Sequence, residues 1–185
     1  WHRGRCLSYG DGIAYWALAE MVRMRAGITE DEDESSAIGK LRDTVAEHVT
    51  DAEEREWVEP RLQHLLGLVE RFAPDREDLF SAWRLFFERI AAQGPVVLVF
   101  EDLHWADAGL LDFVEYLLDW SRNHPIYVVA LARPELADRQ FLVDVKQRGQ
   151  PRLHDRGQSE PDDVPALAAG FLGDEKRKTA GTRDD

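Results

Sequence analysis

The chain has 185 residues, of which 44% are hydrophobic, so it can form one domain with a substantial core. A net charge of −13 argues against general nucleic-acid binding, because phosphate contacts require clustered Lys and Arg. No apolar run approaches the roughly 18 residues of a membrane span, and no signal-peptide pattern is present. Cys6 is the only cysteine, so we expect a soluble cytoplasmic protein without an internal disulfide. Because the sequence begins with Trp1, we also expect a fragment or a processed product.

The N-terminal half is predicted to be mainly helical. Arg5–Tyr9 is typical of a strand end, and apolar residues at helical spacing predict an amphipathic helix over 13–26. After an acidic loop, Ser35 or Ser36 can cap a second helix. Asp51 can cap a third, in which Pro60 marks either the true start or a break.

A fourth helix is predicted over 75–93 and is rich in aromatic residues. Phe80, Trp83, Phe86 and Phe87 share one face, while acidic and basic residues fill the other. This pattern favours burial of the aromatic face in the core over a stacking surface.

The run Val96–Phe100 has five apolar residues and follows a Gly-Pro boundary. Periodicity alone does not distinguish a strand from a buried helix, but the β-branched residues and the boundary favour a strand buried on both faces of a parallel sheet. Glu101 and Asp102 stand where this strand ends. Ligands of open α/β sheets bind beyond the carboxyl ends of the strands, so these acids are well placed to hold a metal-nucleotide.

A second strand and a helix complete a βαβ unit. Asp107 can cap a helix that ends near Asn123, and residues 126–132 form another apolar run. Short connections between them predict a right-handed crossover and an α/β fold.

Four segments together resemble one known family. They are Gly4–Glu20 (G-R-C-L-S-Y-G-D-G-I-A-Y-W-A-L-A-E), Leu79–Glu88 (L-F-S-A-W-R-L-F-F-E), Pro95–Asp107 (P-V-V-L-V-F-E-D-L-H-W-A-D) and Ala130–Leu136 (A-L-A-R-P-E-L). They resemble the STAND-type, AAA-like P-loop ATPase module found beside bacterial adenylate or guanylate cyclase domains and in large ATP-binding transcription regulators. The resemblance implies a partial P-loop NTPase parallel sheet with a βαβ core, a helical insertion and a weakly structured C-terminal tail.

The resemblance also implies a division of the chain. A partial ATPase core is expected over 1–136, a degenerate C-terminal part of that core over 137–173, and a disordered tail over 174–185. Asp162–Leu167 resembles the short helix that the family places after its last strand. Within the core, the expected parts are a strand end, a helical insertion over 13–93, the Walker B strand over 95–102 and a sensor strand over 126–133.

By resemblance, Glu101 and Asp102 are the catalytic acids. Glu101 takes the position that holds Mg²⁺ through water, Asp102 takes the neighbouring position linked to water activation, and Arg133 senses the γ-phosphate of Mg-ATP. Many relatives carry Asp at the first position. As alternatives, both acids simply cap and solvate the turn, and Arg133 is an exposed loop residue. For His104 and Trp105 a structural role in the turn is favoured over nucleotide contact.

A phosphate cradle is not recognisable in the sequence. The motif G-x-x-x-x-G-K-[ST] supplies backbone N–H groups and a Lys to the phosphates. The only Gly-Lys pair is Gly39-Lys40, which has Glu34 in place of the first glycine and Leu41 in place of Ser/Thr. We interpret it as a chance match, so this chain alone should neither hold a triphosphate tightly nor hydrolyse it.

The favoured hypothesis is a fragment of a signal-transduction ATPase whose Mg-ATP binding and hydrolysis switch a regulatory or cyclase-linked protein. Its expected partners are ATP, an upstream P-loop segment, and sensor and output domains of the same polypeptide. Two alternatives stay open: an ATP-independent protein-interaction module and a truncated remnant without function.

Overall fold

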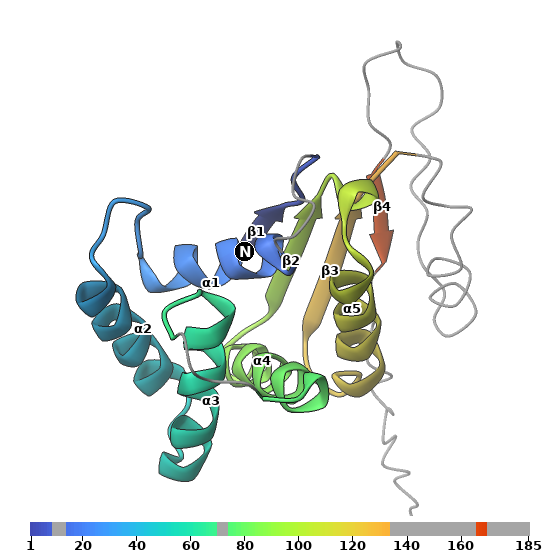
Figure 1. Cartoon of the computed structure of the whole chain (residues 1–185). Coiled ribbons are helices and arrows are strands. Elements are labelled where there is room, and N and C mark those ends of the chain that lie inside the picture. The colour runs from blue at the N-terminus through green and yellow to red at the C-terminus, as the bar shows by residue number, and fades with distance from the viewer. Residues whose placement is uncertain (9–13, 70–73, 134–165, 170–185) are drawn as a thin grey trace, which may run out of the picture.

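The computed structural model describes residues 1–8, 14–69, 74–133 and 166–169. Its centre is a sheet in the order β1-β2-β3-β4 (Figure 1). β1 (His2–Arg5), β2 (Val96–Glu101) and β3 (Ile126–Leu131) are parallel, and β4 (Ala166–Ala169) pairs antiparallel with β3. The prediction of an α/β fold with two buried strands joined by a helix is therefore confirmed.

The described ranges contain five α-helices, of which four lie between β1 and β2 in the chain. They are α1 (Trp16–Ala26), α2 (Glu34–His48), α3 (Ala52–Leu65), α4 (Arg76–Ala91) and, after β2, α5 (Ala108–Trp120). α1 packs on β1, whereas α2 and α3 pack on each other and contact α1 and α4 farther from the sheet (Figure 1). None of the helices in the described ranges is long and apolar enough to span a membrane.

In the described ranges, aspartates cap α2, α3, α4 and α5 from the preceding residue, whereas Tyr15 before α1 makes no side-chain cap hydrogen bond. Asp51 accepts a hydrogen bond from the backbone N–H of Glu54 at 2.9 Å, so its predicted role is confirmed. The predicted serine cap of α2 is wrong, because Asp33 occupies the cap and its carboxylate accepts the Ser36 N–H at 3.0 Å. The backbone of Asp33 is extended just before the helix, so its carboxylate can reach this N–H, whereas Ser36 already lies within the helix.

Pro60 lies inside α3 and marks neither its start nor a break, contrary to expectation. The proline removes one backbone donor, and this cost is opposed by burial of Val58 and Leu62, both fully shielded from solvent. Trp83 of α4 also donates its indole N–H to the Arg61 carbonyl at 3.0 Å. Tertiary packing therefore outweighs the local preference.

The aromatic face of α4 forms the centre of the core, as predicted. Phe80, Trp83, Phe86 and Phe87 are each at most 4% exposed. Phe80 and Trp83 make edge-to-face contacts with Phe113 of α5 at centroid distances of 5.4 and 5.6 Å. These contacts join α4 to the helix that follows the acidic strand end.

The expected short helix over Asp162–Leu167 is wrong where the structure describes it. Ala166 and Leu167 belong to β4 and pair with Leu131 and Ala130 of β3. The edge of β3 offers backbone hydrogen-bonding groups that a short strand can satisfy. Residues 162–165 lie outside the described ranges, as do residues 174–185 and most of the expected segment 137–173.

Candidate functional site

The three parallel strands end at a common edge of the sheet. The register pairs Arg5 with Glu101 and Phe100 with Ala130, so β1, β2 and β3 finish side by side. Glu101 closes β2, Asp102 follows it, and Arg133 follows β3 by two residues. This edge is the location at which the sequence predicts the site.

Glu101 is held by two arginines from β1. Its side chain is 17% exposed, with Oε2 3.2 Å from Arg5 Nη2 and Oε1 3.6 Å from Arg3 Nη1. Arg5 Nε also donates to Oε2 at 3.3 Å. Arg5 thus donates twice to one carboxylate oxygen and Arg3 contacts the other, so together they orient this carboxylate.

Asp102 turns the chain away from the sheet. Its φ of 54° lies in the left-handed region, which Asp tolerates better than most residues, and the 3-10 turn Leu103–Trp105 follows. Its side chain is 38% exposed, and Oδ2 lies 3.7 Å from Arg5 Nε. Arg5 therefore bridges both candidate acids.

The position of Arg5 depends on close contact between β1 and α1. The Arg5 backbone N–H donates to Glu20 Oε2 of α1 at 2.8 Å. A Cβ atom at Gly4 would lie 1.9 Å from the Ala17 carbonyl oxygen of α1, closer than any real contact. Only glycine allows this approach of helix and strand backbones.

Asp107 fixes the start of α5, as predicted for a helix cap. Oδ1 accepts the Leu110 N–H at 2.9 Å, and Oδ2 accepts the Tyr15 N–H at 3.3 Å. Tyr15 has a left-handed φ of 64° and directly precedes α1. One carboxylate thus connects the helix after the acidic turn to the helix that packs on β1.

A family model described as an AAA ATPase domain matches residues 1–130. The chain belongs to this family. The match includes the strand that ends in Glu101, the Asp102 turn and most of β3, and it stops before Arg133. No curated protein and no solved structure matches the chain.

Just beyond the residues matched by the AAA ATPase domain, Arg133 contacts Trp105. The side chain of Arg133 is exposed, and its Cζ lies 5.9 Å from the Trp105 ring centroid. Trp105 is 47% exposed, and its ring also lies 5.1 Å from that of His104. A guanidinium over an indole face is a favourable cation–π arrangement. The edge thus combines two carboxylates, three arginines and an accessible aromatic ring.

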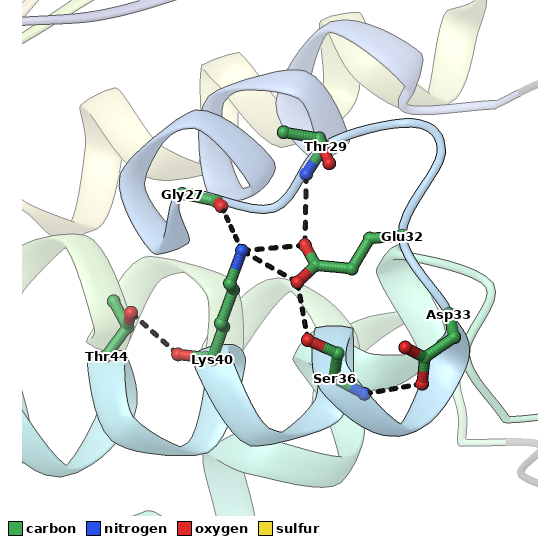
Figure 2. A network of polar contacts seen from close by, with 7 residues as sticks. All are labelled: Gly27, Thr29, Glu32, Asp33, Ser36, Lys40 and Thr44. Atoms are coloured by element: carbon green, nitrogen blue, oxygen red, sulfur yellow. Dashed lines mark hydrogen bonds and ion pairs between the residues drawn. The ribbon is translucent and has the colours of Figure 1, made fainter.

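Gly39 and Lys40 do not form a phosphate loop. Both are helical, within α2, and the Lys40 ammonium lies 2.7 Å from Glu32 Oε1 and 2.9 Å from the Gly27 carbonyl oxygen (Figure 2). A phosphate loop instead presents open backbone N–H groups in a turn. The hydrogen bonds from Lys40 and Ser36 lower the pKa of Glu32 from 4.5 to about 2.

The residues of the edge fit a magnesium-nucleotide, but not a metal held by protein alone. The described ranges contain no group of three or more His, Cys, Asp or Glu residues placed to hold a metal. Mg²⁺ requires only one or two carboxylates when water and phosphate oxygens complete its shell. Glu101 and Asp102 meet that requirement, and the family implies a nucleotide as ligand.

Arg5 and Arg3 are the residues of this edge that sequence reasoning missed. The available signal was the strand period of two, which places both on the same face while His2 and Gly4 are buried. That period does not reveal which strand lies beside β1. The pairing with Glu101 spans 96 positions in the chain and requires the sheet register.

Proposed function

We propose that this chain is part of a STAND-type signal-transduction ATPase, in which Mg-ATP binding and hydrolysis rearrange a sensor and an output domain. The output is a nucleotide cyclase or a transcription regulator. The single observation that supports this proposal best is the pair Glu101–Asp102 at the carboxyl edge of the parallel sheet of an AAA ATPase domain.

Each residue of the edge has a defined task in this proposal. Glu101 orients the water shell of Mg²⁺, and Asp102 orients the attacking water and accepts its proton. Arg5 holds the Glu101 carboxylate in place, and Arg133 senses the γ-phosphate after leaving Trp105. Bound Mg²⁺ supplies charge stabilisation at the transferred phosphoryl group.

The phosphate cradle comes from an upstream P-loop segment of the same polypeptide. The printed sequence has no G-x-x-x-x-G-K-[ST], and Lys40 is engaged with Glu32 on α2. We therefore expect the full-length protein to hydrolyse ATP and the isolated 185-residue chain to show no turnover.

The test is the double variant Glu101→Gln/Asp102→Asn in the full-length protein. Phosphate release should fall by roughly 100-fold or more, since a general base is lost, while binding of a fluorescent ATP analogue is largely retained. The matched control Asp43→Asn/Glu56→Gln neutralises two exposed carboxylates on α2 and α3 and should leave turnover unchanged. Unchanged turnover in the Glu101/Asp102 variant would remove these acids from the mechanism and favour an ATP-independent interaction module.

A further inference from the structure

The strand edge also carries a large aromatic side chain, that of Trp105. It belongs to the 3-10 turn that follows Asp102. The Trp105 backbone N–H donates to the Asp102 carbonyl oxygen at 2.9 Å, and Leu103 of the same turn is fully buried. Trp105 itself nevertheless remains 47% exposed. The backbone of Trp105 is thus fixed to the acidic turn, while much of its side chain stays accessible.

Arg133 reaches this ring from the neighbouring strand. β2 and β3 lie side by side, and Arg133 follows β3 by two residues (Figure 1). Its Cζ lies 5.9 Å from the Trp105 ring centroid, within the range of a cation–π contact. An aromatic ring, and not a carboxylate, therefore holds this arginine at the edge of the sheet.

The three arginines of the edge are engaged in different ways. Arg3 and Arg5 form ion pairs with Glu101. Among the residues that the structure describes, no carboxylate pairs with Arg133. A ring face attracts a guanidinium without satisfying its N–H donors, so those of Arg133 remain available. A phosphate group can accept them in charge-assisted hydrogen bonds, which are stronger than an exposed cation–π contact.

We propose that Trp105 is a positioning residue that holds Arg133 until a γ-phosphate draws it away. ATP has to release Arg133 from the ring before the guanidinium binds the γ-phosphate. ADP has no γ-phosphate and leaves the contact intact. The strength of the contact therefore helps to set how strongly the site favours ATP over ADP. This inference rests on the proposed function, in which Arg133 senses the γ-phosphate.

The experiment compares the affinities of the full-length protein for a non-hydrolysable ATP analogue and for ADP, both with Mg²⁺. Trp105→Ala should bind the ATP analogue about twofold to fivefold more tightly, because an exposed cation–π contact no longer competes, and should bind ADP as the parent does. Trp105→Phe retains a weaker ring and should give a smaller increase. No change, an equal change for both nucleotides, or weaker binding of the ATP analogue by Trp105→Ala would overturn the proposal.

The matched control is Trp120→Ala. Trp120 is another exposed tryptophan, but it lies at the last position of α5, and its ring contacts Tyr116. This variant should leave both affinities unchanged. If it tightens binding of the ATP analogue as much as Trp105→Ala, the effect does not come from the contact with Arg133 and the proposal fails. Circular dichroism checks that all variants are folded.

Arg133→Gln separates this inference from the proposed function. It should weaken binding of the ATP analogue about tenfold without changing that of ADP, and Trp105→Ala should then have no further effect. If Arg133→Gln leaves both affinities unchanged, the sensor role and this inference fail together. If Arg133→Gln weakens only the ATP analogue while Trp105→Ala changes nothing, the sensor role stands and this inference alone is overturned.

A second measurement needs no nucleotide and uses the 185-residue chain. The ring current of an indole shifts the nuclear magnetic resonance signals of a guanidinium side chain stacked on it. Trp105→Ala should move the Arg133 side-chain signals toward those of an exposed arginine, whereas Trp120→Ala should not. Arg133 signals that stay in place in Trp105→Ala would show that the contact is absent in solution and overturn the proposal.

Discussion

The α1–α2 loop and the carboxyl end of β2 both bring acidic and basic side chains together, but they do so with different geometry. Glu32 of this loop lies 2.7 Å from Lys40 of α2, which also donates to a backbone carbonyl (Figure 2). At the strand end, Arg5 is 59% exposed and lies 3.2 Å from Glu101 and 3.7 Å from Asp102. In the first, one ammonium is shared between a carboxylate and a backbone carbonyl, whereas in the second one guanidinium is shared between two carboxylates at longer distances.

This difference separates a chance motif from a candidate site. Gly39-Lys40 matches only the Gly-Lys pair of a phosphate loop, and the lysine joins α2 to the end of α1. Glu101 and Asp102 instead contact arginine side chains that are themselves exposed, Arg3 at 63% and Arg5 at 59%. Four perturbations test this contrast.

The largest effect is expected for Gly4→Ala, which forces β1 and α1 apart. The added Cβ would meet the α1 backbone at 1.9 Å, so the free energy of unfolding should fall by about 3 kcal/mol. Urea denaturation measures this change. Gly94→Ala is the matched control because a Cβ there meets nothing within 4 Å, and it should stay within about 0.5 kcal/mol of the parent. Equal stabilities of the two variants would show that β1 and α1 separate easily.

A smaller effect is expected for Asp107→Ala, which frees two backbone N–H groups beside the acidic turn. We expect a loss of about 2 kcal/mol, compared with about 1 kcal/mol for Asp75→Ala, whose carboxylate caps α4 through the Asp78 N–H. Thermal or urea unfolding of both variants gives the comparison. A larger loss for Asp75→Ala would show that the Tyr15 contact adds no stability.

Arg5→Gln tests whether the acids are available to a cation. Removal of the positive charge that bridges Glu101 and Asp102 should raise the affinity for Mn²⁺ about fivefold, the effect of about 1 kcal/mol between exposed charges. Electron paramagnetic resonance measures free Mn²⁺. The control Arg42→Gln removes an arginine paired with Glu59 and should change nothing. Identical Mn²⁺ affinities for all three proteins would contradict the role of Arg5.

The smallest effect on stability is expected for the exposed Glu32–Lys40 contact. The pKa of Glu32 is lowered in the folded state, so its contribution is present above pH 4.5 and is lost as the pH falls toward about 2. In Lys40→Met this pH dependence should weaken, and the pKa of Glu32 should rise toward its ordinary value. Carboxyl titration by nuclear magnetic resonance measures the pKa. A value still near 2 in that variant would assign the shift to Ser36 and Thr29.

Much of the fold could be predicted because its signals are local. Val96–Phe100 predicts a buried strand from composition and boundary, and Asp51 and Asp107 predict helix starts because a cap acts within three residues. The position of Glu101 at a strand end follows directly from that strand. Its assigned roles stay a prediction.

Other features follow only from the tertiary structure. Pro60 remains within a helix because Trp83 and the neighbouring apolar residues hold α3 on α4. Ala166 and Leu167 form a strand because the edge of β3 is available to them.

By itself, the sequence determined the α/β class, the acidic end of β2 and the aromatic core, because each is encoded by residues adjacent in the chain or one helical turn apart. The tertiary structure alone decided that Arg5 faces Glu101 across 96 positions and that Lys40 binds Glu32. The partner of a charged side chain is set by which elements lie side by side and in which register. Neither the neighbours of an element nor its register can be deduced from a local sequence pattern.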